Sequence, residues 1–161
     1  MTKFEDLIPV LAAADVEFIL VGGLAAIVHS SSRATYDVDV VYRRSPENME
    51  RLCRTLAPHS PRLRGAPPGL PFVLDEKTMA FGLNFTLSTD LGDLDLFGEI
   101  PGGGNYDELL SGTEEREIFG HACRVVSLET LLRLKRSTGR AKDLEATAEL
   151  EEIKRRQEGR F

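Results

Sequence analysis

Two short segments of this chain alternate aspartate with an aliphatic residue: Asp37-Val38-Asp39-Val40 and Asp93-Leu94-Asp95-Leu96. Successive side chains of a strand point to opposite faces, so each segment predicts a strand with one aliphatic face and one acidic face. Two carboxylates about 7 Å apart along one strand face repel each other unless a cation lies between them. The pattern therefore predicts a sheet that carries a cation site.

A neighbouring strand can bring Asp95 beside Asp37 and Asp39. Mg²⁺ suits such a set because it prefers hard oxygen ligands and keeps positions for water and phosphate. Three carboxylates can hold two metal ions roughly 3.5–4 Å apart, an arrangement used for in-line phosphoryl displacement. We expect Asp93 to be a solvated or supporting carboxylate and not a ligand.

A glycine pair, Gly22-Gly23, lies between a predicted buried strand, Phe18–Val21, and a small-residue helical stretch, Leu24–His29. Glycine lets backbone N–H groups approach a phosphate closely, and a helix N-terminus favours an anion. The sequence therefore predicts a phosphate site at the glycine pair. A serine and arginine loop follows and can add donors: Ser30, Ser31, Ser32 and Arg33.

The remaining pattern predicts a mixed β-sheet with helices packed on it, an α+β fold. Further strands are expected at Asp37–Tyr42, Leu70–Leu74, Leu83–Leu87, Leu94–Phe97 and His121–Val126. Helices are expected over 2–14 with a Thr2–Glu5 capping box, from Ser45-Pro46, over Tyr106–Leu110, from Ser127 through Lys135, and over Arg140–Arg156. Five prolines fall within residues 58–71, which predicts a loop there.

The length of 161 residues predicts a single domain, 1–161. The net charge of −6 argues against a surface devoted to long nucleic acid. There is no apolar run of the roughly 20 residues that a membrane span needs. The presence of only two cysteines, Cys53 and Cys123, argues against a disulfide framework, so we expect a cytoplasmic protein with no membrane partner.

Several weaker signals leave alternatives open. Gly102-Gly103-Gly104 lacks the lysine and helix pattern of a P-loop, so a turn is the better interpretation. His29 fits a packed histidine better than a catalytic base. Lys135 and Arg140 belong to a positive cluster that either complements a helix dipole or contacts phosphate.

Gly22-Gly23, then Asp37-Val38-Asp39-Val40 after thirteen residues, and the later Leu94-Asp95-Leu96 together resemble the nucleotidyltransferase superfamily that contains DNA polymerase beta. The sequence is most similar to small prokaryotic members: minimal nucleotidyltransferases and abortive-infection transferases of toxin–antitoxin systems. Residues 106–110, 128–135 and 139–143 are similar to the C-terminal half of that group, and residues 58–71 match it least. Many active members have Gly-Ser where this chain has Gly-Gly.

The resemblance implies transfer of a nucleoside monophosphate from a nucleoside triphosphate, such as ATP, to an acceptor hydroxyl. Asp37 and Asp39 would bind two Mg²⁺ ions, and Asp95 would bind the catalytic ion and assist deprotonation of the acceptor. Nucleotide-binding residues would be Gly22, Gly23, Ser32, Arg33, Lys135 and Arg140. The acceptor would be a protein side chain, a tRNA end or a small molecule such as an aminoglycoside.

Two other functional classes compete with this interpretation. A non-catalytic relative would bind a nucleotide or a partner protein, as one half of a toxin–antitoxin pair. That alternative does not explain why three like charges are kept together. A two-carboxylate glycosidase would use the paired aspartates but would leave the glycine pair unexplained.

Overall fold

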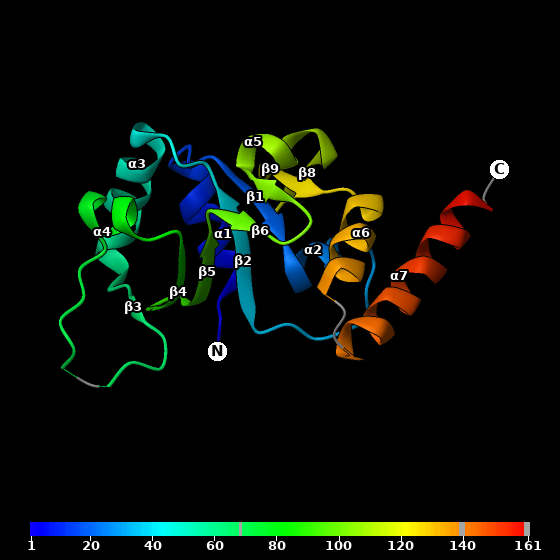
Figure 1. Ribbon diagram of the computed structural model, residues 1–161, viewed down its shortest axis with the longest axis horizontal. Helices are drawn as coiled ribbons and strands as arrows, with labels where there is room; N and C mark the ends of the chain where they lie inside the picture. Colours follow the sequence, from blue (N-terminus) through cyan, green and yellow to red (C-terminus); the bar gives the residue numbers. More distant parts are fainter. Residues whose placement is uncertain (68, 139–140, 160–161) are drawn as a thin grey trace.

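The computed structural model describes residues 1–67, 69–138 and 141–159. They form a mixed seven-stranded sheet in the order β3-β4-β5-β2-β1-β9-β8, with helices packed on it (Figure 1). Its strands are β1 (Phe18–Val21), β2 (Asp37–Tyr42), β3 (Arg62–Leu63), β4 (Asn84–Thr89), β5 (Gly92–Phe97), β8 (Thr113–Ile118) and β9 (His121–Val126). The predicted α+β class with a mixed sheet is confirmed.

The centre of the sheet aligns the two acidic segments. β2 runs antiparallel to β1 and parallel to β5, and the β2–β5 register pairs Asp37 with Asp93 and Asp39 with Asp95. Val38 and Leu94, which alternate with these aspartates, are fully buried. Burial of the aliphatic face thus fixes the register that gathers the carboxylates on the other face.

The helices are α1 (Phe4–Ala13), α2 (Gly22–Val28), α3 (Pro46–Leu56), α4 (Glu76–Phe81), α5 (Tyr106–Leu109), α6 (Leu128–Thr138) and α7 (Ala141–Glu158). α2 packs on β1 and β2 and touches α6, which packs along α7. Figure 1 shows α3 and α4 at one end of the molecule and α6 and α7 at the other. None of the described helices is long and apolar enough to cross a membrane.

Side-chain caps mark the starts of α3 and α6, and one predicted cap is wrong. Ser45 accepts from the Asn48 backbone, as expected, and Ser127 accepts from the Thr130 backbone. α1 instead begins after Lys3, without a side-chain cap. The Thr2 hydroxyl, expected to cap it, donates to the Tyr36 carbonyl and accepts from the Asp93 backbone, so it ties the N-terminus to the sheet.

Other differences from the expected elements lie at the sheet edges. The sequence pattern predicts a strand at Leu70–Leu74, but the structure has no regular element there, and Leu70 and Val73 are exposed. The predicted proline-rich loop contains the two-residue strand β3, and β8 and α4 were not predicted. Residues 101–103 form the turn that joins β6 (Glu99–Ile100) and β7 (Gly104–Asn105), so the glycine run forms a turn, as expected, and its last residue, Gly104, begins β7. The last predicted helix is found at α7, but its expected first residue, Arg140, lies outside the described residues.

Candidate active site

Three carboxylates meet on one face of β2 and β5. Asp37, Asp39 and Asp95 each offer one oxygen, and these oxygens lie within 4.8 Å of one another. We call this set the acidic trio. Asp39 and Asp95 are register partners on parallel strands, and Asp37 is two residues before Asp39 on the same face. The expected convergence of the three residues is therefore found.

The trio has the properties of a cation site. Asp39 Oδ1 is buried and has no hydrogen-bond partner among the described residues. Burial, the carboxylates of Asp95 and Asp37 and a hydrogen bond with Asp95 raise the pKa of Asp39 to about 7, against a smaller opposing effect of Lys135. Like charges held this closely at a partly buried position need a counter-charge, and hard oxygen donors suit Mg²⁺. The residues present thus fit a divalent metal ion.

The glycine pair lies close to the trio, with Gly22 packed against the Asp39 side chain. Gly22 has a positive φ of 68°, and a Cβ there would collide with the Asp39 carboxylate. A Cβ at Gly23 would lie 2.5 Å from Thr35 Oγ1. The turn from β1 into α2 therefore requires glycine at both positions simply to pack against β2 and the loop before it. A substitution at Gly23 would disturb folding as well as any phosphate that binds there.

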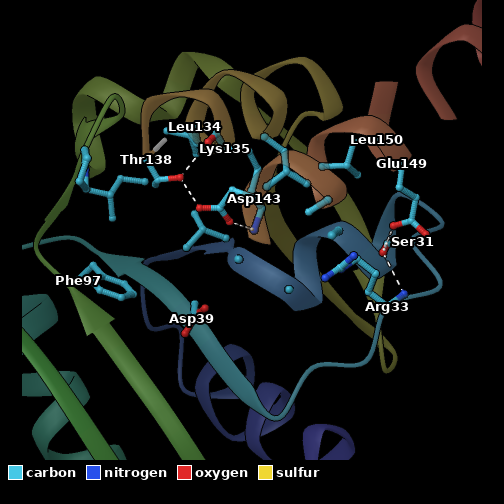
Figure 2. Close-up of a pocket in the computed structure, with 18 of the residues that line it drawn as sticks. Ser31, Arg33, Asp39, Phe97, Leu134, Lys135, Thr138, Asp143, Glu149 and Leu150 are labelled. Carbon is cyan, nitrogen blue, oxygen red and sulfur yellow. Dashed lines mark hydrogen bonds and ion pairs between the residues drawn. The ribbon is translucent and has the colours of Figure 1, made fainter. Parts of the chain in front are cut away.

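A cavity of about 450 Å³ opens beside Asp39. In Figure 2, Phe97 lies at one side of it and Ser31 and Arg33 lie at the other, with Asp39 below and Lys135 and Asp143 above. Its wall also includes the glycine pair and apolar side chains of β6, α6 and α7, among them Ile100, Leu131, Leu134 and Leu150. The cavity thus joins an apolar wall to a charged floor.

The predicted nucleotide-binding residues differ in their position relative to this cavity. Gly22, Gly23, Arg33 and Lys135 line it. Lys135 Nζ lies 3.8 Å from Asp143 Oδ1, and Arg33 Nη1 lies 3.7 Å from Glu145 Oε2. Both cations are therefore held by carboxylates of α7.

The serines of the loop after α2 are also held by α7. The Ser31 and Ser32 hydroxyls both donate to the Glu149 carboxylate, and these bonds lower the pKa of Glu149. Ser31 lines the cavity, whereas Ser32, the predicted ligand, is not among its lining residues. Arg140 lies outside the described residues, so its predicted role stays a prediction.

The cation that contacts the trio, Arg64, is not among the residues that the sequence predicts for the site. Arg64 follows β3 in the proline-rich segment, and its guanidinium lies 2.8 Å from Asp95 Oδ1, 3.4 Å from Asp93 Oδ1 and 3.8 Å from Asp37 Oδ2. Asp93, expected to be a supporting carboxylate, is a partner of Arg64 and is outside the trio. No local sequence signal marks Arg64, because its partners are about thirty residues away along the chain.

His29 is a packed histidine, as expected. Its side chain is almost fully buried, and Nε2 lies 2.8 Å from the Val126 carbonyl and 3.5 Å from Glu114 Oε1. It is not among the residues that line the cavity.

The sequence matches no family model and has no significant match among curated proteins. The fold does match solved structures. A lincosamide antibiotic adenylyltransferase, LnuA, in its lincomycin-bound crystal structure, superposes with a TM-score of 0.60 at 16% identity, over 91% of this chain and 93% of that chain. This chain has the nucleotidyltransferase fold.

Two further structures with the nucleotidyltransferase fold are similar. ANT(2'')-Ia in complex with adenylyl-2''-tobramycin gives a TM-score of 0.53 at 16% identity, over 92% of this chain and 90% of that chain. An antigenic nucleotidyltransferase-like protein from Paracoccidioides brasiliensis gives 0.54 at 19% identity, over 91% of this chain and 72% of that chain. At these identities the agreement concerns the fold.

Proposed function

We propose that this protein transfers a nucleoside monophosphate from a nucleoside triphosphate to an acceptor hydroxyl, with Mg²⁺ held by Asp37, Asp39 and Asp95. The observation that carries the proposal is the trio itself, with oxygens within 4.8 Å of one another beside a cavity on the nucleotidyltransferase fold. A bound pair of Mg²⁺ ions would neutralise phosphate charge and polarise the acceptor oxygen.

The carboxylates of the trio would have different roles in the transfer. In the transfer, an acceptor oxygen forms a bond to the α-phosphorus, the bond to the bridging oxygen breaks, and pyrophosphate leaves. The proton of the acceptor hydroxyl would pass to the Asp95 carboxylate, whose side chain is 15% exposed at the edge of the trio. Asp37 and Asp39 would fix the position of the metal ions.

The cavity would hold the nucleotide. Its apolar wall, with Phe97 and Leu134, suits a base and ribose, and the glycine pair with Lys135 and Arg33 would face the triphosphate. Wall residues come from both halves of the chain, because β1 and α2 supply one side and α6 and α7 the other. We therefore propose that residues 1–161 act as one domain.

For the acceptor we propose a small polyhydroxylated molecule. Two of the similar structures carry such compounds, lincomycin in one and adenylyl-2''-tobramycin in the other. The net charge of −6 also fits a cationic amino sugar better than RNA. A protein or tRNA acceptor and a toxin or antitoxin partner stay predictions.

The test is an acceptor screen. The purified chain is incubated with Mg²⁺, each of the four common nucleoside triphosphates and a panel of aminoglycosides, lincosamides, tRNA and proteins. Pyrophosphate release and mass spectrometry of the acceptor are then measured. We expect release that needs both an acceptor and Mg²⁺, and an acceptor mass increased by one nucleotidyl group.

Asp39→Asn and Asp95→Asn are the inactive controls, and the exposed Asp15→Asn is the matched active control. Nucleotide binding without transfer to any acceptor would favour the alternative, a non-catalytic relative that binds a nucleotide or a partner. Equal transfer by wild type and Asp39→Asn would contradict the proposed site.

A further inference from the structure

The charge of the site is unbalanced without Arg64. Four carboxylates face one another across β2 and β5, those of the acidic trio and Asp93, and the Arg64 guanidinium contacts three of the four. Lys135, whose charge also acts on Asp39, is paired with Asp143 on the opposite side of the cavity (Figure 2). Arg64 thus supplies the single positive charge in direct contact with the trio among the described residues.

Arg64 is held there by more than its charge. Its backbone N–H donates to the Thr86 carbonyl at 3.0 Å, which extends the β3–β4 pairing by one residue. Its Nη2 donates to the Leu87 carbonyl at 2.7 Å as well as to Asp95 Oδ1. The side chain is 27% exposed. These contacts fix the guanidinium on the β4 and β5 side of the trio.

We propose that Arg64 sets the cation affinity of the site: it is the intrinsic counter-ion of the acidic trio, and a divalent cation competes with it for Asp95 and Asp37. This inference rests on the metal site of the proposed function. A carboxylate oxygen that accepts a hydrogen bond from a guanidinium is less available to a metal ion, and a positive charge a few ångströms away repels that ion. The affinity of the trio for a cation is therefore lower than three carboxylates alone would give.

The proposal also connects the proline-rich segment to the site. Arg64 lies between the short strand β3 and the following coil, so its ion pairs attach that segment to β5. A cation that takes over Asp95 releases one of the guanidinium's attachments, whereas the Leu87 and Asp93 contacts can persist. Cation binding and the order of the Arg64 side chain are thus coupled.

The test measures Mn²⁺ binding by calorimetry in the absence of nucleotide, for wild type, Arg64→Met, Arg64→Lys and Arg62→Met. Methionine keeps the apolar stem of Arg64 and removes the charge. Arg62, two residues earlier on β3, is the matched control because its side chain is 58% exposed and pairs with Asp90, outside the trio.

We expect Arg64→Met to bind Mn²⁺ about tenfold more tightly or better, since removing a unit charge near a divalent ion has at least that effect even at the dielectric constant of water. Arg64→Lys and Arg62→Met should remain within about threefold of wild type. Unchanged or weaker binding by Arg64→Met would overturn the proposal. If none of the four proteins binds Mn²⁺, the metal site of the proposed function fails instead.

A second readout uses the wild-type chain alone. Arg64 Nε is buried, so we expect its N–H to exchange slowly with solvent, and addition of Mg²⁺ should accelerate that exchange in an NMR measurement. Exchange that Mg²⁺ leaves unchanged, in a protein that binds the ion, would contradict competition. If Arg64→Met does not fold, Arg64→Gln, which keeps a donor for the Leu87 carbonyl, replaces it in the binding experiment.

Discussion

Replacing Asp39 by asparagine should stabilise the metal-free protein, and the gain should grow with pH. Asn has nearly the shape of the carboxyl group but carries no charge. In the folded protein, burial and the neighbouring carboxylates raise the pKa of Asp39 from 3.8 to about 7. The folded state therefore keeps a proton that the unfolded chain has already released. Stability falls as pH rises from about 4 to 7, and above that range the whole penalty is present.

The magnitude follows from the size of the shift. One pKa unit corresponds to about 1.4 kcal/mol, so the penalty that Asp39 imposes is roughly 4 kcal/mol at pH 8 and roughly 2 kcal/mol at pH 5. The advantage of Asp39→Asn should therefore increase by about 2 to 3 kcal/mol between these two pH values. For a chain of this size that increase corresponds to roughly 5–10 °C in melting temperature.

The assay is urea unfolding of wild type and Asp39→Asn in chelator at pH 5 and pH 8. Asp15→Asn is the matched control, because Asp15 is exposed and has a left-handed φ of 58°, which asparagine adopts readily. A variant less stable than wild type at pH 8 would refute the reasoning and would make Asp39 a structural partner of a nearby cation. An equal gain in the free energy of unfolding at both pH values would show that the raised pKa of Asp39 is not its cause.

Three further outcomes test other parts of the structure. Gly22→Ala should lower the free energy of unfolding by about 1–3 kcal/mol, because a Cβ at that positive φ meets the Asp39 carboxylate, and urea unfolding measures it. Lys135→Met should weaken nucleotide binding about tenfold in calorimetry, whereas exposed Arg136→Met should not. Asn48→Ala should cost about 2–4 kcal/mol of stability in the same urea assay, because the fully buried amide makes three hydrogen bonds to backbone groups.

The central part of the fold could be predicted because each segment there has one unambiguous pattern. In β2 the aspartates alternate with fully buried valines, and β1 is a continuous apolar run. Ser45-Pro46 specifies a helix start by itself. Such local patterns are sufficient to predict an element when its own few residues show which face is buried and which is exposed.

The edges of the sheet could not be predicted in this way. β8 is mostly polar on both faces, with the sequence TEEREI, and only its pairing with β9 makes it a strand. Leu70–Leu74 has the composition of a strand, but it contains Pro71 and pairs with nothing among the described residues. In both cases tertiary pairing, and not local propensity, decides the structure.

The same distinction between local pattern and tertiary contact holds for the candidate site. Asp37, Asp39 and Asp95 could be predicted because the alternation of side chains along a strand places them on one face. The register of the neighbouring strands β2 and β5 then pairs Asp39 with Asp95. Arg64 could not, because its contacts join a proline-rich segment to strands about thirty residues away along the chain. The Glu149 bonds to Ser31 and Ser32 span still more of the chain, and no sequence pattern indicates which carboxylate takes those hydroxyls.

The most direct test of the proposed site is a crystal structure with Mn²⁺ and a non-hydrolysable ATP analogue, in which anomalous scattering locates the metal. The account predicts Mn²⁺ coordinated by Asp37, Asp39 and Asp95, with the triphosphate against Gly22 and Gly23 and the base in the cavity beside Phe97. Nucleotide bound in the cavity without metal at the trio, or Mn²⁺ bound only elsewhere, would contradict it.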